Sequence, residues 1–214
     1  MIPGLDYIYQ CPECGKRISI GSILSGNTFG ATIYSDGKKD APMLPNYPDL
    51  VKCSKCEAFF WLHNLRPVEE IDAWQKKSWE ETNNEEYPLE ASFLDLPDLL
   101  VALDKKVYRT EIEELDLRQN IWWAFNDRVR AGKEIFARPD HSAIWEDNLR
   151  KFQAMLNQED PSDSLRIAEI HRNLSEFDKC MKKLNTIKDP DVIWVVEKIK
   201  SECMRGNSLV VKLS

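Results

Sequence analysis

The chain has 214 residues, 43% of them hydrophobic, and a formal net charge of −7 at pH 7. This length allows one large domain or two small ones with a hydrophobic core. No stretch is long and apolar enough to span a membrane, and residues 1–10 lack the basic and apolar regions of a signal peptide. We therefore expect a cytoplasmic protein with no membrane partner.

The charge is unevenly distributed along the chain. Residues 1–66 carry 7 Lys/Arg and 6 Asp/Glu, whereas residues 67–214 carry 22 Lys/Arg and 30 Asp/Glu. Proteins that bind nucleic acid through its phosphate groups present an excess of Lys and Arg. Neither part of the chain has that excess, so the charge disfavours a nucleic-acid partner.

Two Cys-x-x-Cys pairs, Cys11/Cys14 and Cys53/Cys56, are the most informative motif. Two cysteines at this spacing on a tight turn can direct both sulfurs to one ion, and Zn²⁺ prefers four such ligands in a tetrahedron. Gly15 suits the positive φ that such a turn often needs. Disulfides are the alternative, which the spacing and the expected cytoplasmic location disfavour. Four thiolates leave no open position for water, so the sequence predicts one structural Zn²⁺.

Each cysteine pair lies between two segments with strand character. Residues 5–9 and 17–20 flank the first pair, and residues 50–51 and 58–62 flank the second. Aromatic and β-branched residues, which are common in strands, are frequent in these segments. The sequence predicts two hairpins that share one ion, which is the arrangement of a zinc ribbon.

The 38 residues between Cys14 and Cys53 are more than a minimal ribbon needs. Residues 28–34 have strand character, residues 35–38 (Ser-Asp-Gly-Lys) favour a turn, and three prolines then favour an extended return. We expect a small β-insertion that covers the ribbon. Residues 26–30 lack the Gly-Lys-Ser/Thr end of a phosphate-binding loop, so a turn is expected there.

His63 lies seven residues after Cys56 and is a further candidate ligand. Because four cysteines already complete a tetrahedral shell, ligation by His63 is not expected. Residues 59–61 are Phe-Phe-Trp, and three adjacent side chains cannot all face one side of a strand. We expect one face to pack on the ribbon and the other on the helices that follow.

From residue 68 onward the apolar periodicity predicts helices at 68–82, 97–106, 109–131, 142–158, 162–172, 175–186 and 190–204. The predicted fold class is therefore α+β. Residues 1–66 are expected to form a zinc-ribbon β domain with an inserted β-hairpin, and residues 67–214 an all-α domain of helical hairpins.

The predicted helix at 109–131 is apolar on two sides, so we expect it to be sandwiched between neighbours. Its two stripes are Ile112, Leu115, Trp122 and Val129, and Leu117, Ile121 and Phe125. Residues 122–123 (Trp-Trp) and 126–128 (Asn-Asp-Arg) could form a binding site. Core tryptophans beside a capping or salt-bridged polar cluster are the favoured interpretation.

The last predicted helix, 190–204, has one apolar stripe that ends at Cys203, and Trp194 points roughly opposite to it. Something is expected to cover Trp194. The apolar residues 209–211 could fold back onto it, and this interpretation is favoured over a partner protein or a second copy of the chain.

Residues 162–187 resemble one tetratricopeptide unit, with small Ala168 and Cys180 where the two helices of that motif cross. Ser164 stands where the motif usually has tryptophan, so the match is partial. A single unit must pack on neighbours to bury its face. We expect His171 to be a packed histidine, and Cys180 and Cys203 to be small core residues.

The whole chain resembles a family of uncharacterised bacterial proteins that join a four-cysteine zinc ribbon to a tetratricopeptide-like helical domain. The resemblance rests on 11–15 (Cys-Pro-Glu-Cys-Gly), 26–30, 35–37 (Ser-Asp-Gly) and 53–61, and on 122–130 and 168–177 in the helical part. It implies this architecture and Cys11, Cys14, Cys53 and Cys56 as zinc ligands. It implies no known activity.

The sequence is compatible with three kinds of function. The leading hypothesis is a non-enzymatic, zinc-stabilised interaction or scaffold protein that binds a protein or peptide, because stacked helical hairpins offer grooves for such partners. The first alternative is nucleic-acid binding through the ribbon. Its candidate contacts are Lys16, Arg17, Lys38, Lys39, Lys52 and Lys55. An enzyme is less favoured, because none of the three histidines lies in a recognisable nucleophile or second-metal pattern.

Overall fold

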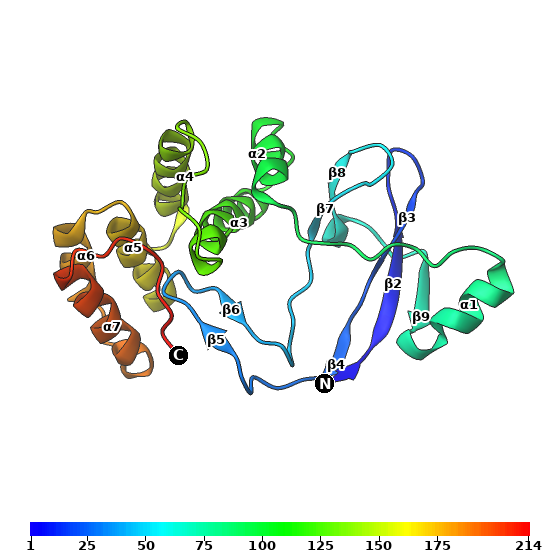
Figure 1. Ribbon diagram of the computed structural model, residues 1–214, viewed down its shortest axis with the longest axis horizontal. Helices are drawn as coiled ribbons and strands as arrows, with labels where there is room; N and C mark the ends of the chain where they lie inside the picture. The colour runs from blue at the N-terminus through cyan, green and yellow to red at the C-terminus, as the bar shows by residue number, and fades with distance from the viewer. The chain divides into compact units, whose positions relative to one another are not determined.

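The computed structural model describes residues 1–214, except for the side chain of Ala73 (Figure 1). The chain forms two compact units, Met1–Ala31 with Ala41–Val107, and Thr32–Asp40 with Tyr108–Ser214. We call the first the cysteine unit and the second the helical unit. The cysteine unit contains small antiparallel sheets, and helices follow in the rest of the chain, so the mixed α+β class is confirmed. The division differs from the expected boundary between residues 66 and 67.

A three-stranded antiparallel sheet forms the centre of the cysteine unit, in the order β3–β2–β9. Strand β2 (Leu5–Gln10) pairs on one side with β3 (Arg17–Ile20) and on the other with β9 (Glu69–Asp72). The prediction that residues 68–82 form one helix is wrong at its start. Residues 69–72 are a strand because Ile71, 4% exposed, packs with Ile8 and Trp79 while its neighbours face outward.

The rest of the cysteine unit is made of short elements. Strands β7 (Leu50–Lys52) and β8 (Phe59–Trp61) form the second predicted hairpin, with Val51 opposite Phe60. The other elements are β1 (Ile2–Pro3) paired with β4 (Ile23–Ser25), the 3₁₀ turns η1 (Leu62–Asn64) and η2 (Ala73–Gln75), α1 (Lys76–Asn83) and α2 (Leu96–Asp104). Trp61 donates its indole N–H to the Val107 carbonyl at 3.1 Å, so the end of this unit packs on β8.

Five helices of the helical unit follow the predicted order. They are α3 (Glu111–Arg130), α4 (His141–Met155), α5 (Pro161–Asn173), α6 (Phe177–Leu184) and α7 (Ile193–Met204), the last preceded by the 3₁₀ turn η3 (Pro190–Val192). A capping box starts α3, since the Thr110 side chain accepts from the Glu113 N–H and the Glu113 carboxylate accepts from the Thr110 N–H. One predicted stripe of α3 is fully buried, but Ile112 of the other is 80% exposed.

The predicted turn at 35–38 is confirmed, and the hairpin around it groups with the helical unit rather than with the ribbon. Strands β5 (Thr32–Ile33) and β6 (Lys39–Asp40) form a hairpin that belongs to the helical unit. Tyr34 forms an antiparallel bridge with Lys212, so the C-terminal segment runs beside this hairpin. Figure 1 shows the red C-terminal segment next to β5. Polar contacts with α3 and α5 attach this hairpin to the helical unit.

Helices α5, α6 and α7 share one apolar core. Its buried members are Ala168, Cys180, Leu184, Ile187, Val196, Ile199 and Cys203. Cys180 and Cys203 lie there with their sulfurs 3.0 Å apart, which confirms their role as small core residues. The prediction that the C-terminal segment covers Trp194 is wrong, because this segment pairs with β5 and Trp194 is 46% exposed. None of the described helices has the length and apolar character that a membrane span requires.

Candidate metal centre

The two cysteine pairs occupy turns with the same backbone geometry. Cys11 N–H donates to the Lys16 carbonyl and Gly15 N–H to the Cys11 carbonyl, both at 2.9 Å. In the second turn Cys53 N–H donates to the Ala58 carbonyl and Glu57 N–H to the Cys53 carbonyl, also at 2.9 Å. The fifth residue of each turn has a positive φ, 68° at Gly15 and 59° at Glu57. The turn conformation predicted at Gly15 therefore also occurs at Glu57, where a side chain must adopt it.

These turns bring all four cysteine sulfurs together. The ligand atoms of Cys11, Cys14, Cys53 and Cys56 lie within 4.8 Å of one another, and the Cys11–Cys56 and Cys14–Cys53 sulfurs are 3.6 Å apart. A tetrahedron with Zn–S bonds of about 2.3 Å has sulfurs about 3.8 Å apart. A disulfide would bring two sulfurs to about 2.05 Å, and all four cysteines are free. The arrangement fits one metal ion with four thiolate ligands.

The thiols of Cys53 and Cys56 differ in pKa. Burial would raise the pKa of Cys53, but hydrogen bonds from the backbone N–H groups of Cys56 and Lys55 outweigh burial and lower the pKa to about 7. The Lys55 N–H lies 3.4 Å from the Cys53 sulfur. A backbone contact at Ala58 favours the Cys56 thiolate, but burial and the neighbouring thiols outweigh it and raise the pKa of Cys56 to about 12. The Cys53 thiolate therefore forms easily, whereas a bound cation would have to displace the proton of Cys56.

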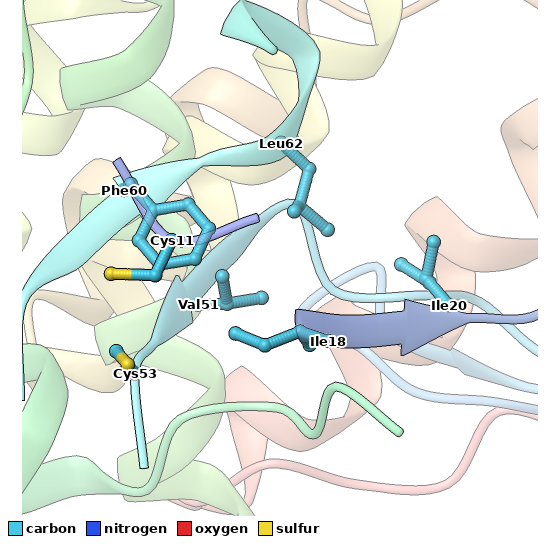
Figure 2. Close-up of a cluster of buried hydrophobic side chains, with 7 residues drawn as sticks. All are labelled: Cys11, Ile18, Ile20, Val51, Cys53, Phe60 and Leu62. Carbon is cyan, nitrogen blue, oxygen red and sulfur yellow. The ribbon is translucent and has the colours of Figure 1, made fainter. Parts of the chain in front are cut away.

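The site lies at one end of an apolar cluster that joins the two hairpins. Its members are Cys11, Ile18, Ile20, Val51, Cys53, Phe60 and Leu62, all buried. Figure 2 shows Cys11 and Cys53 at one end of the cluster and Ile20 at the other. This core is small, because few apolar side chains separate the hairpins. Metal ligation would therefore supply a large part of the free energy that holds the hairpins together.

The other candidates from the sequence lie outside this cluster. His63 is not among the clustered ligands, and its Nδ1 hydrogen-bonds the Asp49 carboxylate instead. Of the proposed nucleic-acid contacts, Arg17 pairs with Glu69 at 3.1 Å and Lys52 with Asp98 at 3.0 Å. Lys38 and Lys39 belong to the β5–β6 hairpin of the helical unit. The six basic residues therefore do not form one surface of the cysteine unit.

A cluster of polar side chains lies in the helical unit, and the sequence indicated only part of it. Asp36, 1% exposed, accepts from Asn126 at 2.8 Å and from Arg130, and its carbonyl accepts the Trp123 indole N–H at 3.1 Å. Lys38 next to it donates to Asp127 at 2.7 Å. Asp127 and Arg130 are thus ion-paired near the buried Trp122, which confirms the favoured interpretation in part. Arg128 forms no ion pair with a described residue and donates to the Glu134 carbonyl instead, and Trp123 is half-buried. The sequence signal was the spacing of Trp122, Asn126 and Arg130, which places them on one face of a helix.

The same hairpin is bound a second time by α5. Arg172, fully buried, donates to the Ser35 hydroxyl at 3.1 Å and to the Asn207 carbonyl at 2.6 Å, and it forms an ion pair with buried Glu169. The Ser35 hydroxyl also accepts the Val211 N–H at 3.0 Å. The hairpin turn thus occupies the polar face that α3 and α5 present, and it is a structural part of the helical unit.

Comparison with known proteins found no matching protein-family model, no matching curated protein and no matching solved structure. The comparisons therefore do not assign the chain to the family that its motifs resemble.

Proposed function

We propose that the protein is a zinc-stabilised interaction protein without a catalytic site. The observation that carries the proposal is the cluster of four cysteine sulfurs within 4.8 Å. Tetrahedral sites of four thiolates hold Zn²⁺ or iron, and Zn²⁺ is the ion that structural sites of this kind most often contain. Four thiolates leave no coordination position for a substrate or a reactive water, so the role of the metal is structural. A reducing compartment such as the cytoplasm is part of this proposal, since free thiols persist there.

The charge of the cysteine unit supports a protein partner over a nucleic acid. This unit carries 9 Lys/Arg and 15 Asp/Glu, a formal net charge of −6. Zn²⁺ bound to four thiolates would add about −2 more. Such a surface repels phosphate groups, and two of its basic residues are already paired with carboxylates.

Two assays on the zinc-loaded full chain test this function. The first measures binding to labelled single- and double-stranded DNA and RNA at low salt, where we expect none. The second is affinity purification from the native cell, where we expect a protein whose recovery falls with Cys53→Ser and is unchanged with the control Cys203→Ser. Binding to nucleic acid that weakens steeply with salt would contradict the proposal and favour the alternative.

A further inference from the structure

Residues 89–91 pair with the outer edge of β3 in the cysteine unit and leave an open strand edge. The Ser19 N–H donates to the Leu89 carbonyl at 2.9 Å and the Ala91 N–H to the Ser19 carbonyl at 2.7 Å, which forms a parallel bridge between Ser19 and Glu90. Because successive residues of a strand direct their peptide groups to opposite edges, the N–H and carbonyl of Glu90 point away from β3. No described residue hydrogen-bonds either group. The sheet therefore ends here with an unused donor and acceptor.

Two large apolar side chains beside this edge are exposed, Leu89 at 60% and Phe93 at 59%. Ala91, which lies between them in the chain, packs on the apolar cluster of Ile18 and Ile20 in β3 (Figure 2). Residues two apart in a strand share a face, so Leu89 continues the apolar face of β3 beyond the last paired residues. A further strand at this edge would place side chains beside Leu89 and cover it.

The charges at this edge define the chemistry of such a strand. Glu86 and Glu90 are exposed, and neither forms an ion pair with a described residue. Other carboxylates of the cysteine unit are already paired, as Asp98 is with Lys52 at 3.0 Å. A second copy of the chain, paired at the same edge, would bring like charges together, which destabilises a sheet. A basic strand meets these carboxylates with opposite charge.

We propose that the outer edge of residues 89–91 binds an extended peptide segment in which Lys or Arg alternates with apolar residues. The peptide backbone pairs with the N–H and carbonyl of Glu90 as an added strand. Side chains of the peptide alternate between two faces, so the apolar ones lie on the face of Leu89 and the cations on the face of Glu90. This inference rests on the proposed interaction function and names the kind of partner that the cysteine unit takes.

The test is a nuclear magnetic resonance titration of the zinc-loaded full chain, read at the backbone amide of Glu90. The probe is the blocked peptide Lys-Val-Lys-Val-Lys. One comparison peptide, Glu-Val-Glu-Val-Glu, reverses the charge. The other keeps the side chains of the probe but is N-methylated at every residue, so it has no backbone donors for a strand.

We expect the probe to shift the Glu90 amide signal in a saturable way and to slow hydrogen exchange of this amide, because the amide gains an acceptor. Both comparison peptides should bind more weakly. Glu90→Gln should weaken binding of the probe about two- to fivefold, as loss of an exposed ion pair does. The control Glu81→Gln, at an exposed position of α1 outside this edge, should leave binding unchanged.

Two results would overturn the proposal. One is a Glu90 amide that neither shifts nor exchanges more slowly with the probe at up to about 10 mM, beyond the millimolar Kd of weak complexes. The other is equal binding of the probe and either comparison peptide. If zinc-loaded protein captures a partner protein in either case, this inference fails and the interaction function stands. If the chain binds nucleic acid in a salt-dependent way while Glu90 responds as expected, the interaction function fails and the edge remains a peptide site.

Discussion

Asp36 and Arg130 form a buried ion pair although 94 residues separate them in the chain. The side chain of Asp36 is fully buried and that of Arg130 is 10% exposed. The pair attaches the turn of the β5–β6 hairpin to α3. Two nearby polar atoms, Asn126 Oδ1 and Arg130 Nε, are buried without a partner among the described residues. The Asp36–Arg130 ion pair therefore offsets part of the free energy required to bury these polar groups. Its loss should lower the stability of the helical unit.

We expect Asp36→Ala to lower the free energy of unfolding of the helical unit by about 1–3 kcal/mol, because it removes the buried acceptor of Asn126 and one of the two carboxylates that pair with Arg130, the other being Asp127 at 2.7 Å. Denaturant unfolding followed by far-ultraviolet circular dichroism measures this loss. Asp40→Ala is the control, since Asp40 lies on the same hairpin and is exposed. In the Asp36→Ala background, Arg130→Met should cost much less than in the wild type. Equal costs in the two backgrounds would show that the pair does not hold the hairpin.

Replacement of Glu57 by glycine should stabilise the second cysteine turn. Glu57 has a φ of 59°, which costs a residue with a Cβ about 1 kcal/mol and costs glycine nothing. Glu57→Gly is therefore expected to raise the unfolding free energy of the cysteine unit by about 1 kcal/mol, and Gly15→Ala to lower it by a similar amount. Glu57→Ala is the control, because it removes the exposed contact with Lys52 but keeps the Cβ. If Ala and Gly at position 57 were equally stable in thermal unfolding, strain at this turn would be ruled out.

Glu176 makes the helical unit sensitive to acid. Hydrogen bonds from Arg150 first, and then from His171 and Lys179, outweigh burial and lower the pKa of Glu176 to about 2. A carboxyl whose pKa is lower in the folded than in the unfolded chain adds stability above its unfolded pKa, about 4.5, and loses it as the pH falls through 2. Glu176→Gln should cost up to about 3 kcal/mol at pH 7 and nothing near pH 2.

Unfolding of the wild type and of Glu176→Gln between pH 2 and pH 7 measures this difference. The exposed Glu197 provides the control variant Glu197→Gln. A cost of Glu176→Gln that does not change with pH would mean that the carboxylate charge contributes no stability.

The C-terminal segment should matter for the buried polar cluster and not for Trp194. Arg172 donates to the Asn207 carbonyl, and Asn173 donates to the Ser208 carbonyl at 2.9 Å. Removal of residues 207–214 leaves these two buried donors unpaired, at about 1–3 kcal/mol each. The unfolding midpoint should fall, whereas the fluorescence contribution of Trp194, measured against Trp194→Phe, should stay the same. Lys212→Ala, an exposed position of the segment, should leave both unchanged. A change in the fluorescence contribution of Trp194 would indicate instead that the segment covers this residue.

The sequence was sufficient for the features that depend on local spacing. Residues three apart in Cys11/Cys14 and Cys53/Cys56 determine the turns, and the flanking segments form the hairpins, because turn geometry and alternation are local properties. The helices from α2 to α7 follow from their apolar periodicity in the same way. Strand β9 was missed because residues 69–72 present a single buried side chain, Ile71, which is too short a pattern to distinguish from the start of a helix.

Long-range pairing could not be read from the sequence. The turn at Ser35 and Asp36 was predicted, but nothing local indicates that Arg130 and Arg172 complete its hydrogen bonds. Composition likewise did not show that residues 69–107 belong with the cysteines and carry most of the acidic excess of that unit.

The central claim, one Zn²⁺ held by Cys11, Cys14, Cys53 and Cys56, is tested most directly by native mass spectrometry of the purified full chain. We expect the mass of one zinc per chain, and its loss from Cys53→Ser but not from the control Cys180→Ser, whose sulfur lies in the core of the helical unit. The zinc-free variant should keep its helical circular dichroism signal, because the helical unit has its own apolar core. A wild-type chain that is fully reduced and folded, yet takes up no zinc, would contradict the account.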